Sequence, residues 1–230
     1  MKPQKIFIKR KKNFNLNCQK NKFVLFVGEN GRLDADLPLN GLIADFIKKF
    51  TSKRVFKNLS INQSISLDNP LTLEPDFILI VKVKNFVDDK DLYDFGKIIS
   101  KFKAKSSVSI IWSINKPFTS TARTIQLRSY VFDKLKSERT RSRGTAETIF
   151  FIDEKFKFSK LDLSKNDALA EGVFLSRDLV NLPANILNTE KFESELKKLK
   201  KIGVKVRVLN EKDIKAIGMN LLFEVGKGSK

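Results

Sequence analysis

The stretch FVLFV at residues 23–27 is an uninterrupted apolar run that Gly28 stops. A short run of this kind is typical of a strand that is buried on both faces of a sheet. Similar runs recur at residues 77–81 (FILIV), 108–114 (VSIIWSI) and 148–152 (TIFFI). The sequence therefore predicts a sheet built around these buried strands.

Segments with apolar residues at helical spacing lie between the strands, at residues 41–50, 92–102 and 120–137. The alternation of strand and helix signals is typical of a layered α/β domain. We therefore expect residues 1–153 to form an N-terminal layered α/β domain with a mixed or parallel sheet. The chain has 20 phenylalanines, and those in these segments lie on apolar faces or in buried runs, which favours core packing over base stacking.

A polar, lysine-rich stretch at residues 154–167 (EKFKFSKLDLSKND) is the best candidate for a linker between domains. After it we expect a linker helix from about Ala168 to Leu182, because Pro183 disfavours helical geometry in the residue before it. The next helix is expected to begin at Asn188, a residue type that caps helix N-termini well.

Valine alternates with basic residues at positions 204–208, directly after Gly203, which is placed to end a helix. The alternation predicts a half-buried strand, and a short helix that ends at Gly218 is expected to follow it. Residues 168–230 are therefore expected to form the first helix–strand–helix elements of a second α/β domain.

The chain of 230 residues contains no histidine. This excludes serine or cysteine nucleophiles that need an imidazole base, and it excludes histidine-ligated zinc sites. Any metal chemistry here would have to use carboxylates. Cys18 is the only cysteine, and no apolar run approaches the roughly 20 residues that a membrane span needs. The basic start lacks the features of a secretory signal, so we expect a cytoplasmic protein without membrane contact.

The formal net charge of +19 favours a nucleic-acid partner, because clustered basic side chains release counterions when they neutralise phosphates. The basic residues are, however, dispersed through almost every segment. The densest early cluster, Lys9–Lys12, follows a short apolar run, so a solvated strand end and a contact with a polyanion both remain open. Nonspecific DNA binding is therefore kept as an alternative.

Two glycine-containing segments partly resemble phosphate-binding loops. Lys227 is followed by glycine where a phosphate loop needs serine or threonine, and residues 28–31 lack the spacing of a dinucleotide-binding loop. Both interpretations are rejected, and residues 28–31 are expected to form a loop after a strand.

Residues 176–187 (SRDLVNLPANIL) resemble the start of the catalytic domain in the leucyl aminopeptidase (cytosol aminopeptidase) family. Residues 204–229 resemble the family's next strand, a turn with Asp213, Gly218 and Met219, and a segment that ends in VGxGS. The order and spacing of these matches support the resemblance.

The resemblance also extends upstream. Residues 129–137 (SYVFDKLKS) resemble the segment that closes the family's N-terminal domain, so the matches cover about residues 129–230. Residues 1–128 agree with the family only in the layout of strands and helices. The chain departs at residues 81–85, where the family often has a glycine-bearing turn.

The resemblance implies a two-metal exopeptidase, a hydrolase that releases N-terminal residues, often leucine, from peptides. In the family, two divalent ions, zinc or manganese, are held by aspartate, glutamate and lysine side chains, and the enzyme is a cytoplasmic hexamer. These ligands and the catalytic residues lie in motifs that follow VGxGS, so we expect them beyond residue 230. We therefore assign no catalytic, metal-binding or substrate-binding residue, and we expect this truncated stretch alone to be inactive and free of metal.

The acidic residues of the C-terminal part are spread over predicted helices and are often interleaved with lysines, which is typical of solvated ion pairs. They are Asp167, Glu171, Asp178, Glu190, Glu193, Glu195, Glu211, Asp213 and Glu224. We expect Pro183, Asn185 and Asn188 to stop one helix and cap the next without touching substrate. Two alternatives to an aminopeptidase remain, namely a basic nucleic-acid-binding module and a noncatalytic interaction protein.

Overall fold

The computed structural model describes residues 6–9, 22–31, 41–68, 77–101, 108–137, 149–152 and 160–228. Its contacts divide the chain into two compact units, Met1–Phe174 and Leu175–Lys230. Several positions singled out in the sequence lie outside the described residues: Lys11, Lys12, Cys18, Phe102, Thr148 and residues 154–159. Among the helices that are described, none is long and apolar enough to cross a membrane.

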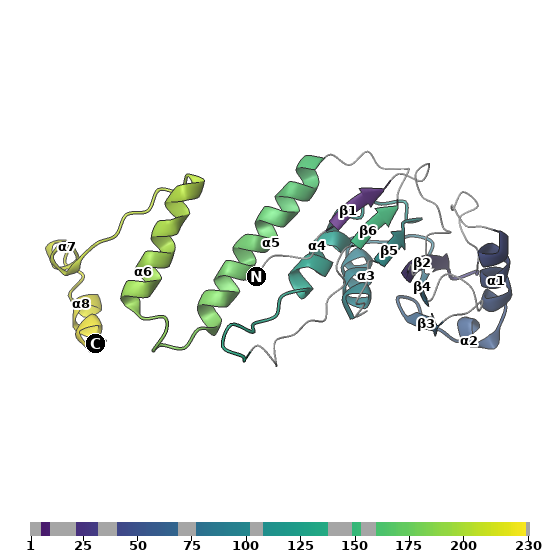
Figure 1. The fold of residues 1–230 in the computed structure, drawn as a ribbon, viewed down its shortest axis with the longest axis horizontal. Helices are drawn as coiled ribbons and strands as arrows, with labels where there is room; N and C mark the ends of the chain where they lie inside the picture. Colours follow the sequence, from purple (N-terminus) through teal and green to yellow (C-terminus); the bar gives the residue numbers. More distant parts are fainter. Residues whose placement is uncertain are drawn as a thin grey trace. The chain divides into compact units, whose positions relative to one another are not determined.

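The first unit contains a mixed sheet with the strand order β1-β6-β5-β2-β4-β3 (Figure 1). Every neighbouring pair is parallel except β3 and β4, which are antiparallel. The α/β class and the mixed sheet expected from the sequence are therefore confirmed. The strands are β1 (Ile6–Lys9), β2 (Lys22–Gly28), β3 (Ser64–Asp68), β4 (Phe77–Val83), β5 (Val108–Ile111) and β6 (Ile149–Ile152).

Strand β2 lies between β4 and β5, so Val24 faces Leu79 on one side and Ile110 on the other. Its side chains alternate between two apolar cores, one on each face of the sheet. Val24 and Phe26 belong to one core, whereas the remaining residues of the run, Phe23, Leu25 and Val27, belong to the other. This double burial explains why the run is apolar at every position.

Helices cover both faces of the sheet. One face is covered by α1 (Gly41–Thr51) and the short α2 (Arg54–Lys57), which contribute Ile47, Phe50 and Phe56 to the core. The other face is covered by α3 (Asp89–Lys101) and α4 (Thr119–Arg128), whose core residues include Phe95 and Ile125. The layered arrangement of a sheet between helices is thus formed within the first unit.

The expected helix at residues 120–137 is too long, because α4 ends at Arg128. Ser129 turns the chain out of the helix, and its Oγ donates a hydrogen bond to the Gln126 carbonyl at 2.6 Å. The Tyr130 ring then packs on Phe174, with 5.2 Å between the ring centroids. A local side-chain hydrogen bond and tertiary packing therefore override the apolar periodicity.

Helix α5 (Lys160–Asn181) begins earlier than the expected Ala168, inside the lysine-rich stretch. Asn166 explains the extension, because it is 3% exposed and accepts a hydrogen bond from Arg123 Nε at 3.2 Å. Its Nδ2 donates to the Thr119 carbonyl at 3.3 Å, so a buried polar contact holds the first turns of α5 on α4. A linker at residues 154–167 stays a prediction, with residues 160–167 helical.

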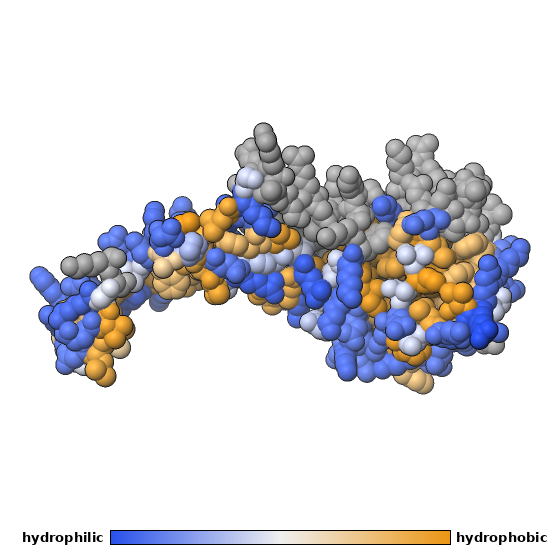
Figure 2. Space-filling view, turned by 90° about the horizontal axis from the view of Figure 1, so that it is seen from below, coloured by the Kyte–Doolittle hydropathy of each residue, from blue (hydrophilic) through white to orange (hydrophobic). Residues whose placement is uncertain are grey.

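The second unit contains α6 (Thr189–Lys198), the 3-10 helix η3 (Leu199–Ile202), α7 (Glu211–Ala216) and α8 (Asn220–Lys227). The predicted strand at residues 204–208 is not formed. A strand needs a hydrogen-bonded neighbour, and the described part of this unit provides no second strand. In α8, the exposed apolar residues are Leu221, Leu222 and Val225, and hydrophobic residues gather at this end of the chain (Figure 2).

Candidate functional site

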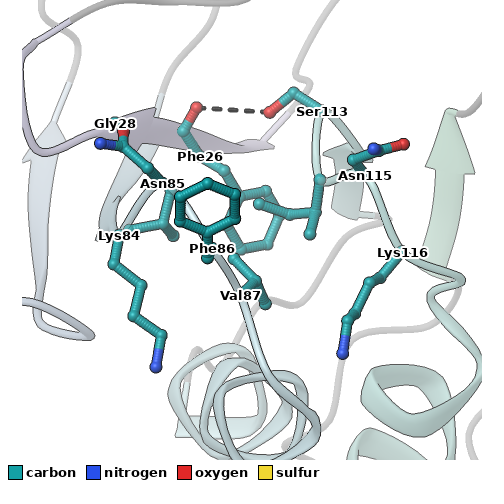
Figure 3. Close-up of a pocket in the computed structure, with 11 residues that line it drawn as sticks. Phe26, Gly28, Lys84, Asn85, Phe86, Val87, Ser113, Asn115 and Lys116 are labelled. Carbon is teal, nitrogen blue, oxygen red and sulfur yellow. Dashed lines mark hydrogen bonds between the residues drawn. The ribbon is translucent and has the colours of Figure 1, made fainter.

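A cavity of about 380 Å³ lies at the carboxyl ends of β2, β4 and β5 (Figure 3). We call it the strand-end cavity. It is lined by Phe26, Gly28, Val83, Lys84, Asn85, Phe86, Val87, Ser113, Ile114, Asn115 and Lys116. Its volume is within the range of small-molecule sites, which begins at roughly 300 Å³.

The topology of the sheet produces this cavity. The chain leaves β2 toward α1 on one face of the sheet, whereas it leaves β4 toward α3 on the other face. The next strand, β5, then pairs with β2 on the side opposite to β4. Ligands of open α/β sheets bind outside the carboxyl ends of strands at such a reversal of connections. The strand-end cavity therefore occupies the position that this fold class uses for ligands.

The floor of the cavity is apolar and rigid. Phe26 and Ile114 are 2% and 5% exposed and belong to the same core. Trp112 packs edge-on against Phe26, with 5.1 Å between ring centroids. Its Nε1 donates a hydrogen bond to the Lys116 carbonyl at 2.7 Å, which ties the loop after β5 to the core. Ser113 Oγ makes a further, long contact of 3.5 Å with the Phe26 carbonyl (Figure 3).

The rim of the cavity is more polar and more exposed than its floor. Asn85 and Asn115 are exposed and follow β4 and β5, respectively. Phe86 is 90% exposed, and its ring lies in front of the cavity floor in Figure 3. Lys84 and Lys116 flank the cavity on its two sides. The site thus combines an apolar floor with amides, an aromatic ring and two cations at the rim.

Lys84 is held by two carboxylates, one from the turn before α3 and one from the first turn of α3. Its Nζ lies 2.8 Å from Asp91 Oδ2 and 2.9 Å from Asp88 Oδ2. Asp91 also accepts hydrogen bonds from Asn62 Nδ2 at 2.6 Å and from the Asp88 backbone N–H at 2.7 Å. Lys84 is therefore a structural cation, because its charge is already neutralised.

These contacts change the protonation of the three groups. Hydrogen bonds from the Asp91 backbone N–H and then from Lys84 lower the pKa of Asp88 from 3.8 to about 2. Burial of Asp91 acts to raise its pKa, but the hydrogen bonds from Lys84, Asp88 and Asn62 outweigh burial, so the pKa is lowered. The hydrogen bonds that Lys84 donates, to Asp91 first and to Asp88 second, raise the pKa of Lys84. All three groups stay charged near neutral pH.

Lys116 differs from Lys84 in its partner. Its Nζ lies 3.2 Å from Asp89 Oδ1, and the Asp89 side chain is 89% exposed. An exposed pair of this length is weak, because solvent and salt screen it. Lys116 is therefore the rim cation that can exchange its partner for a ligand.

The segment around Pro183, which carries the resemblance to the aminopeptidase family, lies apart from the strand-end cavity in the sequence and makes local structural contacts. The Pro183 carbonyl accepts hydrogen bonds from the backbone N–H groups of Ile186 and Leu187 at 2.9 Å. Asn188 caps α6 as expected, since its side chain accepts from the Lys191 N–H at 2.9 Å. These contacts turn the chain from α5 into α6.

The acidic residues of the second unit make no metal site within the described residues, where no group of three or more metal-ligating side chains occurs. Glu195 pairs with Lys198 at 2.5 Å, and Glu224 with Lys227 at 2.7 Å. Asp213 completes the capping box of α7. Each of these three carboxylates is engaged locally on its own helix.

Comparison with known proteins identifies a family for the C-terminal part of the chain. Residues 174–230 match the model of the cytosol aminopeptidase family, catalytic domain. A probable cytosol aminopeptidase from Dinoroseobacter shibae is 31% identical over 193 residues, which are 84% of this chain and 39% of that relative. The chain therefore spans less than half the length of this relative.

Two solved structures share the fold of this chain. The bottromycin maturation enzyme BotP aligns with a TM-score of 0.60 at 16% identity, over 86% of this chain and 41% of that protein. The leucyl aminopeptidase from Trypanosoma brucei aligns with a TM-score of 0.59 at 14% identity, over 94% of this chain and 46% of that protein.

Fold and sequence together thus define an α/β protein that is related to peptidases. The chain is a part-length relative of the leucyl (cytosol) aminopeptidase family, and residues 174–230 belong to the family's catalytic domain. The resemblance found in the sequence is confirmed.

Proposed function

We propose that residues 1–230 are the front part of an aminopeptidase that releases N-terminal residues from peptides in the cytoplasm. The observation that carries the proposal is the match of residues 174–230 to the catalytic-domain model. The related D. shibae protein, a probable cytosol aminopeptidase, supports it over most of the chain.

Activity is expected to need further segments of a catalytic domain. The engaged carboxylates of the second unit support this, and so do the apolar residues that α8 leaves exposed, Leu221 at 86% and Val225 at 76%. Apolar side chains grouped on one helix face usually pack against another element. We infer that such further segments would cover α8 and supply the metal ligands.

The metal itself is proposed at the level of the family. A structure of BotP in complex with Mn shares the fold, and it aligns with this chain at a TM-score of 0.52. Two divalent ions, zinc or manganese, would polarise the peptide carbonyl and activate a water when bound. A hexameric assembly of the complete enzyme is part of the same proposal.

A chimera tests the proposal. Residues 1–230 are joined to the segment of the D. shibae relative that follows the aligned region, and hydrolysis of leucine anilide is measured with zinc or manganese. We expect the chimera to turn over substrate and the unextended chain to be inactive. A folded but inactive chimera would contradict the assignment. Chelator-sensitive turnover by the unextended chain, free of host aminopeptidase, would contradict the inferred need for further segments.

The net charge of +19 supports a second candidate, nonspecific binding to DNA. Such binding depends steeply on salt, with a log–log slope of about −0.9 for each phosphate neutralised on duplex DNA. Titration of labelled duplexes of unrelated sequence at several salt concentrations measures this slope. A strong preference for one sequence that survives moderate salt would contradict nonspecific binding.

A further inference from the structure

The strand-end cavity presents polar groups that the protein does not use. The side chains of Asn85 and Asn115 are exposed, and neither makes a hydrogen bond with any of the described residues. Asn85 follows β4 and Asn115 follows β5, the two strands that pair with β2 on its opposite sides. An amide offers both donors and an acceptor, so the pair can bind the polar edge of a ligand.

Phe86 supplies an apolar surface beside these amides. It is 90% exposed, whereas Phe26 beneath the cavity is 2% exposed. A single exposed apolar residue is common on protein surfaces. Phe86, however, lines the cavity beside the exposed Asn85, and its ring lies in front of the cavity floor, where it can stack on a flat ligand (Figure 3).

Lys116 supplies the charge. Its only described ion pair is the weak one with Asp89, whereas Lys84 on the opposite side is neutralised by Asp88 and Asp91. The Trp112 hydrogen bond to the Lys116 carbonyl fixes the backbone from which this ammonium group extends. An anionic group bound at the rim would therefore be placed on the Lys116 side of the cavity.

We propose that the strand-end cavity binds a small molecule that combines a flat ring with an anionic group. The ring stacks on Phe86, the anion replaces Asp89 as the partner of Lys116, and a polar group of the ligand, where it has one beside the ring, bonds Asn85 or Asn115. Nucleotides and aromatic amino acids both have this chemistry. The site lies in the first unit and is independent of the proposed peptidase function.

Calorimetric titration of the full 230-residue chain tests the proposal with four probes: adenosine monophosphate, adenosine, ribose phosphate and L-phenylalanine. We expect adenosine monophosphate or L-phenylalanine to bind with a Kd below about 1 mM. Adenosine lacks the anion and ribose phosphate lacks the flat ring, so both should bind at least about tenfold more weakly than adenosine monophosphate. The stronger of the two ring-bearing anions identifies the source of the ligand.

Variants locate the binding. Phe86→Ala and Lys116→Met should each weaken binding about tenfold. Tyr93→Ala and Lys49→Met, which change an exposed aromatic residue and an exposed lysine outside the cavity lining, should leave binding unchanged. Trp112 is the only tryptophan, so its fluorescence provides a second readout of ligand at the Lys116 loop.

Three results would overturn the proposal. The first is no binding by either ring-bearing anion to a chain whose circular dichroism shows that it is folded. The second is equal binding of probes that lack the ring or the anion. The third is full affinity in both Phe86→Ala and Lys116→Met.

Discussion

Asp91 in α3 and Lys84 at the end of β4 form an ion pair with 2.8 Å between Oδ2 and Nζ, and the Asp91 side chain is only 5% exposed. The same carboxylate accepts a hydrogen bond from Asn62 at 2.6 Å. Asn62 precedes β3 and has a φ of 60°, a left-handed conformation that asparagine tolerates better than most residues. One buried carboxylate therefore connects the segment before β3, the end of β4 and the start of α3.

Substituting Asp91 should destabilise the fold. Asp91→Ala removes the acceptor of Asn62 Nδ2 and the Asp88 N–H, and it should lower the free energy of unfolding by about 2 kcal/mol. Asp94→Ala is the matched control, because its pair with Lys97 lies at the helix surface. The control should lose less than about 1 kcal/mol. Urea denaturation of both variants measures the difference, and equal losses would show that Asp91 has no special role.

Acid should weaken this connection in a defined range of pH. The folded pKa of Asp88 is lowered from 3.8 to about 2, and that of Asp91 is also lowered. A lowered carboxyl pKa gives stability that is fully present above the unfolded pKa and is lost as pH falls through the folded value. The unfolding free energy should therefore decrease between pH 3.8 and about 2.

The control for the acid prediction is the double variant Asp88→Asn with Asp91→Asn. Its deficit relative to the unmodified chain should shrink as the pH is lowered through this range, because the unmodified carboxyls become protonated too. Chemical denaturation at several pH values gives the comparison. A deficit that is constant with pH would contradict the assignment.

Lys82 should tolerate no apolar replacement, although its methylene groups are buried. Its Nζ donates to the carbonyls of Leu59 at 2.8 Å, Lys57 at 3.1 Å and Phe56 at 3.3 Å. The Phe56 carbonyl also accepts the Leu59 backbone N–H at 3.1 Å. Lys82→Met therefore removes the Lys82 donor from the carbonyls of Lys57 and Leu59 above all, and it should cost about 3 kcal/mol. Lys101→Met, at an exposed position of α3, should be nearly neutral. Thermal unfolding of the two variants tests this, and similar midpoints would refute it.

Gly96 should be required where α3 crosses α4. A Cβ at this position would lie 2.5 Å from Thr124 Cβ and 2.9 Å from the Thr121 carbonyl oxygen. Gly96→Ala should therefore cost about 2 kcal/mol through overpacking. Gly172→Ala in α5 is the control: nothing lies within 4 Å of its Cβ, so it should stabilise the helix by up to about 1 kcal/mol. Equal effects of the two substitutions would argue against a close helix contact.

The sequence predicts most of the first unit because its signals are local. The run at residues 23–27 is apolar throughout since both of its faces are buried. By contrast, β3 was not predicted, because Ser64 and Ser66 alternate with only two apolar residues at the sheet edge. The start of α5 was missed because a buried asparagine, Asn166, looks like a surface residue in a polar stretch.

The strand-end cavity could not be predicted from local patterns. Asn85 and Asn115 are far apart in the chain and are brought to the same edge only because β4 and β5 both lie beside β2. Two predicted strands also differ from the structure: one is shorter than expected and the other is not formed. Residues 112–114 lie outside β5, and Trp112 Nε1 there donates to the Lys116 carbonyl, whereas residues 204–208 have no neighbouring strand among the described residues. Pairing and crossover decide these features.

The position of β2 between two strands and two cores also determines how the molecule opens. Each of its amide protons is released only when the strand that accepts it separates from β2, and both neighbouring strands are buried between the two cores, so these protons should be among the slowest to exchange. The loops that follow β4 and β5 are not paired in the sheet. Their amide protons can therefore exchange through local opening, without unfolding of the strands. A molecule seated at the end of β2 would then slow exchange in those two loops while leaving the rate in β2 tied to unfolding of the whole unit.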